Sequence, residues 1–289
     1  MDGQASVDLR ESDISRFHPH AYSGEYIRER SAQQYREVYD IIHPLQPPTK
    51  ARGLRLSPYW LRQKELGAVF FESAGWERPQ WFGPNESLLD ELAGPGDTRS
   101  GWEAREWSPM VAAEHRATRE RVALFDLTPF MKLEVTGPGA LAALQRLTAN
   151  NLDRPPGRVT YTAMLDPRGG IKCDLTVTRL STEKFMVVTG GAMGLHDLGW
   201  MRRNVPDDGS VTITDVSAAQ CCIGVWGPKA RELMTSVCED DLTNDGFPYL
   251  AARQITVGGV PCLAVRISYA GELGWEVYAA TELGLRLWD

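Results

Sequence analysis

A strand, a Gly-Pro pair and a helix occur twice along this chain, and this repetition restricts most strongly how the chain can fold. The two copies span residues 133–144 and 223–234, so that Pro138 and Pro228 lie 90 residues apart. Proline in the first turn of a helix loses no hydrogen bond, and a glycine before it permits a sharp entry. The repetition predicts two similar units of paired strands and helices, packed together, and places the chain in the α+β class.

Residues 161–178 follow the first copy, and their pattern predicts a β-hairpin. The turn is Asp-Pro-Arg-Gly-Gly at 166–170, a composition typical of turns, with apolar and β-branched residues on both sides. Asp174 falls inside the second strand. Because burial of an unpaired carboxylate is unfavourable, Asp174 either lies at an exposed strand edge or serves a function.

A turn rich in glycine and glutamate follows the predicted strand 262–269. It has the sequence Gly-Glu-Leu-Gly-Trp-Glu at 271–276 and comes just after Tyr269. Its glycines allow the backbone to approach a ligand closely, and its carboxylates can accept hydrogen bonds. Tyr269 and Trp275 can cover a flat ring. The alternative is an ordinary hairpin turn with solvated acids.

Together the two segments resemble those of the glycine cleavage T-protein (aminomethyltransferase) superfamily. In that family, a Gly-Gly-Ile-x-x-Asp-Leu hairpin and a Tyr-x-Gly-Glu-x-Gly-[Phe/Trp]-Glu turn line a tetrahydrofolate site; residues 169–175 and 269–276 match these motifs. The similarity is greater still to the folate-binding half of dimethylglycine and sarcosine dehydrogenases. It continues through 67–72, 75–82 and 114–126 and covers nearly the whole chain.

This resemblance implies a fold of two ferredoxin-like α+β units followed by a small β-barrel. Residues 57–289 would form the folate-binding domain, and residues 1–56 would be the tail of the central segment of an FAD-dependent oxidoreductase. Outside the repeated units, the spacing of apolar residues predicts helices over 23–39 and 107–126.

The chain is expected to be truncated within this fold. A last helix is predicted to begin at 281, and its apolar residues Leu285, Leu287 and Trp288 should lack supporting contacts because Asp289 ends the chain. The barrel would then be missing. No Gly-x-Gly-x-x-Gly nucleotide fingerprint occurs, so FAD is expected only in a separate domain that this chain lacks.

The resemblance also implies roles for individual residues. Asp174 would be the catalytic carboxylate near the reactive folate nitrogens. Tyr269 and Glu276 would hold the pterin ring, with Glu276 accepting hydrogen bonds from ring N–H groups. Tyr161 and Met164 would form pocket walls, although Met164 also suits an ordinary core position. The alternative for Glu276 is a solvated turn acid.

Composition limits the class of protein. With 43% hydrophobic and 24% charged residues among 289, the chain is an ordinary globular protein. A net charge of −7 and a pI of 5.4 argue against a nucleic-acid partner. Five cysteines without a Cys-x-x-Cys pair predict free thiols and no metal site, as in the cytoplasm or, in a eukaryote, the mitochondrial matrix. No apolar stretch reaches the roughly 18 residues that a membrane helix requires.

Three functions are compatible with these features. The first is the tetrahydrofolate-binding portion of a dimethylglycine or sarcosine dehydrogenase-like protein, which converts an oxidised N-methyl group to 5,10-methylenetetrahydrofolate. The second is a stand-alone aminomethyltransferase of a glycine-cleavage-type system. The third is a non-catalytic regulatory homologue, like the regulatory subunit of pyruvate dehydrogenase phosphatase. The lead-in at 1–56 and the segment 75–82 favour the first; the substrate amine and the oligomeric state are left open.

Overall fold

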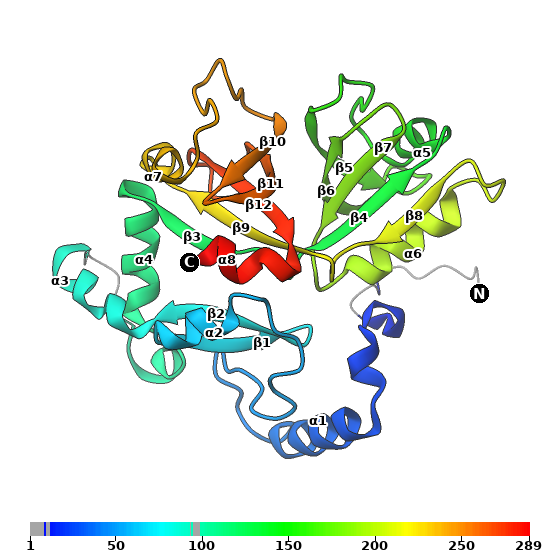
Figure 1. Ribbon diagram of the computed structural model, residues 1–289. Coiled ribbons are helices and arrows are strands. Elements are labelled where there is room, and N and C mark those ends of the chain that lie inside the picture. Colours follow the sequence, from blue (N-terminus) through cyan, green and yellow to red (C-terminus); the bar gives the residue numbers. More distant parts are fainter. Residues whose placement is uncertain (1–8, 10–11, 93, 95–98) are drawn as a thin grey trace, which may run out of the picture.

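Two five-stranded antiparallel sheets stand side by side above a smaller N-terminal layer in the computed structural model (Figure 1). The structure describes residues 9, 12–92, 94 and 99–289. The first residues of the expected lead-in, 1–8 and 10–11, therefore lie outside the described residues. The architecture is mixed, with helices and antiparallel sheets, as expected for the α+β class.

The first sheet contains the predicted hairpin, and its strand order is β5-β6-β7-β4-β8. Its strands are β4 (Met131–Thr136), β5 (Val159–Leu165), β6 (Ile171–Arg179), β7 (Lys184–Thr189) and β8 (Thr212–Asp215). Helices α5 (Ala140–Leu147) and α6 (Gly194–Asn204) complete this unit. Leu144, Val177, Phe185 and Met201 belong to its core.

The second sheet repeats this arrangement, with the order β10-β11-β12-β9-β3. Its strands are β3 (Ala123–Asp126), β9 (Gln220–Trp226), β10 (Ala252–Val257), β11 (Val260–Val265) and β12 (Gly274–Ala280). Helix α7 (Ala230–Val237) follows β9 as α5 follows β4, which confirms both copies of the strand–helix repeat. In both units the strand and helix are followed by three strands of the same sheet; the fifth strand is β8, after them, in the first sheet and β3, before them, in the second.

The prolines of the two Gly-Pro pairs lie before the helices and not in their first turns. Pro138 and Pro228 lie in the turns that precede α5 and α7, two residues before each helix begins. Gly137 and Gly227 adopt φ values of 115° and 139°, which favour glycine, and a Cβ at either position would lie within 2.4 Å of a backbone oxygen. The glycines therefore permit the turn itself, and the prolines do not occupy the first helical turn.

The predicted helix over 107–126 was wrong in its last part. Helix α4 covers only Pro109–Glu120, and residues 123–126 form β3 instead. These residues pair with β9, so tertiary strand pairing overrides the helical spacing of the segment. The chain then crosses from the second sheet to the first between β3 and β4. The buried Lys132 Nζ holds this crossing, donating to the carbonyls of Thr128 (2.8 Å) and Phe130 (2.9 Å).

The two sheets pack face to face, because successive side chains along each strand point alternately into the core of its own unit and toward the other sheet. On β7, Phe185 belongs to the helix-covered core of the first unit, whereas Met186 and Val188 pack toward the second sheet. On β12, Trp275 lies in the core of the second unit and Tyr278 faces the first sheet. A third apolar cluster thus joins the sheets; its buried members are Leu127, Val159, Met186, Val188, Cys222, Trp226, Ala252, Val265 and Tyr278.

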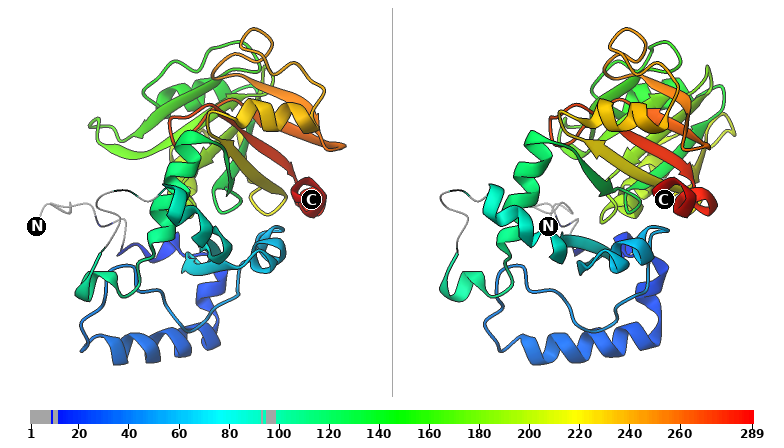
Figure 2. Two further views of the ribbon diagram at one scale, coloured as in Figure 1. Left: turned by 90° about the vertical axis from the view of Figure 1, so that its left-hand side faces the viewer. Right: turned by 60° about the vertical axis from the view of Figure 1, so that its left-hand side comes forward.

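The N-terminal layer lies to one side of both sheets in all three views, and α4 runs between it and the second sheet (Figure 2). Helix α1 (Gly24–Glu37) confirms the predicted helix, and the hydroxyl of Ser23 caps it. The layer further contains α2 (Trp60–Glu65), β1 (Ala68–Ser73), β2 (Trp76–Phe82) and α3 (Leu88–Leu92). Short 3₁₀ helices occur at Ile14–Arg16, Pro19–Tyr22, Gly83–Ser87, Gly101–Ala104 and Thr281–Leu283.

The expectation that the last apolar residues lack support was wrong. Helix α8 (Gly284–Trp288) packs Leu287 and Trp288 against the core of the second unit. The Trp288 ring lies 5.4 Å from that of Tyr59, and Arg62 pairs with the Asp289 side chain at 2.7 Å. Only Leu285 of the three stays 40% exposed. The core of the second unit and the N-terminal layer together supply this support, and the sequence pattern does not show the contacts with that layer.

Candidate functional site

Tyr161 and Asp174 lie on the face of the first sheet that is turned toward the second. Tyr161 pairs with Thr176, and Thr176 pairs with Val188, a member of the cluster between the sheets. Since side chains two residues apart share a face, Asp174 points the same way. The Tyr161 hydroxyl donates to Asp174 Oδ2 at 2.6 Å, and this bond, together with the carboxylate charge, raises the pKa of Tyr161.

Glu276 comes from the facing surface of the second sheet. It lies two residues before Tyr278 on β12, and Tyr278 packs between the sheets. The Tyr278 hydroxyl donates to Glu276 Oε2 at 2.5 Å, and among the described residues no other donor reaches this carboxylate. Burial raises the pKa of Glu276, because the protein surroundings disfavour its charge. Glu276 is thus a half-buried acceptor with unused capacity, not a solvated turn acid.

This burial has a consequence for stability. Because the folded state raises the pKa of Glu276 above 4.5, ionised Glu276 destabilises the fold, and the penalty develops as pH rises through the raised pKa. Glu276→Gln keeps an acceptor for Tyr278 and should melt higher than the wild type at about pH 8. The gain should shrink as pH falls below the ordinary value of 4.5.

Thermal melts of both proteins across this pH range measure the effect, with Glu282→Gln as a control at an exposed position of the same unit. A gain that stays constant with pH would mean that the charge of Glu276 is not what destabilises the fold.

The predicted turn begins earlier than expected. Strand β11 ends at Val265, not Tyr269, and the indole N–H of Trp226 donates to the Ile267 carbonyl at 3.2 Å. Tyr269 is 89% exposed and lies close enough to Tyr161 to contribute to its raised pKa. Glu272 pairs with Arg119 of α4 at 2.7 Å, so it anchors the turn to α4.

Two predicted residues point away from this face. Met164 is completely buried in the core of the first unit, on the side of β5 opposite Tyr161, in agreement with the ordinary core position that the sequence also allowed. Trp275 is equally buried, in the core of the second unit, and packs edge-on against Phe247. The prediction that Trp275 covers a ligand ring was therefore wrong, because Trp275 and Glu276 are adjacent on a strand and must face opposite ways.

The structure thus brings together Tyr161, Asp174 and Tyr269, and places Glu276 on the facing sheet. Tyr278, which holds Glu276, was missed in the sequence. Its spacing of two residues from Glu276 within a predicted strand is the signal that could have found it. Within the described ranges, no three His, Cys, Asp or Glu side chains are arranged to hold a metal ion, and no helix is long and apolar enough to cross a membrane.

Comparison with known proteins agrees with the motifs. The model of the GCVT N-terminal domain matches residues 60–289. The chain belongs to the glycine cleavage T-protein family. The residues that precede this domain, 2–57, match the model of the central domain of FAD-dependent oxidoreductases. The resemblance recognised in the sequence is therefore confirmed.

The similarity to curated relatives extends over the whole of this chain. It is 31% identical over 290 residues to the 4-methylaminobutanoate oxidase (formaldehyde-forming) of Paenarthrobacter nicotinovorans, covering 100% of this chain and 34% of that protein. It is also 31% identical to human mitochondrial dimethylglycine dehydrogenase, covering 100% of this chain and 32% of the relative. The chain spans about a third of the length of these curated relatives.

A solved structure supports the fold. The glycine cleavage system aminomethyltransferase T of Bartonella henselae superposes with a TM-score of 0.63 at 20% identity, over 81% of this chain and 56% of its own. The T-protein fold is thus shared at a level of identity that says nothing of individual site residues.

Proposed function

We propose that the face between the two sheets binds tetrahydrofolate, and that the chain helps transfer a one-carbon unit from an oxidised N-methyl amine to form 5,10-methylenetetrahydrofolate. The observation that carries this proposal is Glu276, a half-buried carboxylate between two sheets whose one protein donor among the described residues is Tyr278. A pterin ring offers N–H donors that would use the remaining capacity of this carboxylate.

The other residues of this face have complementary roles in the proposal. Tyr161 on β5 and Tyr269 in the turn between β11 and β12 are exposed aromatic rings, and they would cover the flat pterin. Tetrahydrofolate supplies, when bound, the nucleophilic nitrogen that receives the one-carbon unit. Asp174, held by the Tyr161 hydroxyl at 2.6 Å, would accept or position a proton of this nitrogen. Met164 has no part in the proposed contacts.

The domain arrangement is part of the same proposal. Residues 57–289 would be the folate-binding domain, built of two ferredoxin-like units, and residues 1–56 the tail of an oxidoreductase central domain. FAD would be bound by a domain outside these residues. The protein would act in the cytoplasm or, in a eukaryote, in the mitochondrial matrix. The match of residues 2–57 to the oxidoreductase central domain favours a dehydrogenase-like protein over a stand-alone aminomethyltransferase.

Calorimetric titration of the chain with folinic acid, a stable folate analogue, tests the proposal. Wild type should bind, and Glu276→Ala should lose about 1.5–3 kcal/mol of binding free energy, the range for hydrogen bonds to a charged group. Glu282→Ala, at an exposed acid of the same unit, should bind like the wild type. Equal affinity of the Glu276→Ala variant and the wild type would remove Glu276 from the site, and a wild type that does not bind would contradict the proposal.

A further inference from the structure

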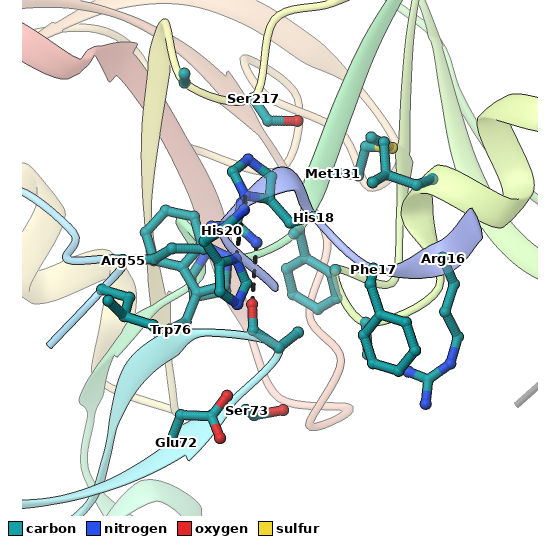
Figure 3. A pocket seen from close by; sticks show the side chains of 18 of the residues that line it. Arg16, Phe17, His18, His20, Arg55, Glu72, Ser73, Trp76, Met131 and Ser217 are labelled. Carbon is teal, nitrogen blue, oxygen red and sulfur yellow. Dashed lines mark hydrogen bonds between the residues drawn. The ribbon is translucent and has the colours of Figure 1, made fainter. Parts of the chain in front are cut away.

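A cavity of about 610 Å³ separates the N-terminal layer from the first sheet (Figure 3). Its wall comes from both matched segments: Arg16, His18 and Arg55 belong to the first, and Trp76 and Met131 to the second. A smaller pocket of about 220 Å³ continues it past Trp76 and Phe130. None of the residues proposed to contact folate lines either space.

Arg55 brings a positive charge to this wall and forms no ion pair there with any residue that the structure describes. Its guanidinium donates to the Ala74 carbonyl at 3.1 Å and lies 4.3 Å from the centre of the Trp76 ring. Among the described residues, no carboxylate lies within ion-pair distance of it. Burial lowers the pKa of Arg55 to about 10, because the surroundings disfavour its charge. A half-buried cation of this kind is stabilised by an anion.

Two histidines extend the same wall. The rings of His18 and His20 stack with centroids 5.3 Å apart, and Figure 3 shows them gathered with Arg55 and Trp76. Burial lowers the pKa of each histidine, and the Arg55 charge adds to this effect. His20 fits only because residue 75 is glycine, with φ at 83°: a Cβ there would lie 2.4 Å from the His20 ring. Nδ1 of His18 and Nδ1 of His20 lie 3.1 Å apart, so when both rings are neutral one Nδ1–H is used between them, and only the accepting ring keeps an Nε2–H donor for a ligand.

Neither acid of the cavity forms an ion pair with Arg55. Glu72 accepts from the Gly75 N–H at 2.5 Å and pairs with Arg30 at 3.4 Å. Asp215 accepts from the Ser217 N–H at 2.9 Å and attracts Arg55 and His18 only from beyond ion-pair distance. Arg55 is thus a cation of this wall that forms no ion pair among the described residues, in a chain whose net charge is −7. Tyr26 is the further titratable side chain on this wall.

We propose that this cavity binds an organic carboxylate, with Arg55 as its counter-ion and the remaining N–H of the His18–His20 pair as a neighbouring donor. A guanidinium fork matches the two oxygens of a carboxylate. Phe17, Trp76 and Phe130 form the apolar part of the wall, which suits a carbon skeleton and not a bare inorganic anion. This site is separate from the folate face and does not depend on it.

Titration of the chain with 3-phenylpropanoate tests the proposal, with its neutral amide and inorganic phosphate as comparison ligands. The carboxylate should bind at least about tenfold more tightly than either, and Arg55→Met should abolish this preference. Arg99→Met is the matched control, because Arg99 also lies over a tryptophan ring, at 5.5 Å from Trp107, but outside the cavity. It should leave the affinity unchanged.

Thermal melting separates loss of the site from loss of the fold. Without ligand, Arg55→Met should still melt in one cooperative transition, which shows that it folds; the carboxylate should raise the melting midpoint of the wild type only. Arg55→Lys, which keeps the charge but not the fork, should bind at an intermediate level. Equal binding of the carboxylate and its amide, equal binding of phosphate, or an unchanged Arg55→Met variant would each overturn the proposal. Folinic acid should bind Arg55→Met as it binds the wild type.

Discussion

Asp174→Asn should lower the formation of 5,10-methylenetetrahydrofolate by about 10²–10⁴-fold, the usual scale for a lost acid–base group. The asparagine oxygen can still accept from the Tyr161 hydroxyl, which donates to Asp174 at 2.6 Å in the wild type, so the hairpin and most of the folate affinity should persist. Amine oxidation occurs at the flavin in the proposed complete protein and should continue, with free formaldehyde released instead. The measurement is the partition of the one-carbon unit between methylenetetrahydrofolate and formaldehyde.

Asp208→Asn is the matched control for this variant. Asp208 is an exposed acid of the same unit, in the loop before β8, where it accepts from the Ser210 N–H at 2.9 Å. This control should leave the partition as in the wild type. An unchanged partition in Asp174→Asn as well would mean that Asp174 is only an exposed carboxylate on a strand, and it would favour the non-catalytic alternative.

Trp275→Ala should destabilise the fold by about 3–5 kcal/mol. Its side chain is completely buried in the core of the second unit, next to Phe247, so removal of the indole leaves a large cavity. Denaturant unfolding of the variant measures the loss of free energy. Tyr269→Ala, at the 89% exposed ring in the turn before β12, should change stability little.

Trp275→Phe distinguishes a core role from ligand contact. Among the described residues, the indole N–H of Trp275 has no hydrogen-bond acceptor, so phenylalanine loses only volume and should fold with a smaller penalty. This variant should bind folinic acid as the wild type does. A large loss of affinity at preserved stability would place Trp275 in the ligand site and contradict its assigned core role.

The repeated strand–helix pattern predicted the organisation of the fold because local signals dominate there. The glycines of both Gly-Pro pairs must adopt positive φ, and alternating apolar residues require two buried faces. The helix predicted over 107–126 failed at its end because β3 depends on pairing with β9, a strand about 100 residues later. Such a non-local contact has no local sequence signal.

The candidate site could be predicted in part for the same reason. Motifs identified Asp174 and Glu276 as carboxylates in unusual positions, but not which way their neighbours point. The alternation of side chains along β5 and β12 turns Met164 and Trp275 into the cores, and this could have been predicted from the strand period alone. The cavity at Arg55 could not be predicted from the sequence, because it is formed by residues of two segments that lie far apart along the chain.

A crystal structure of the chain with folinic acid tests the central claim most directly. We predict electron density for the pterin between the two sheets, with its ring N–H groups within hydrogen-bond distance of Glu276 and its face against Tyr269. The hydrogen bond from Tyr278 to Glu276, 2.5 Å in the free chain, should be retained. Density for the pterin at any other place, for example in the cavity beside Arg55, or a Glu276 without contact to the ligand, would contradict the account.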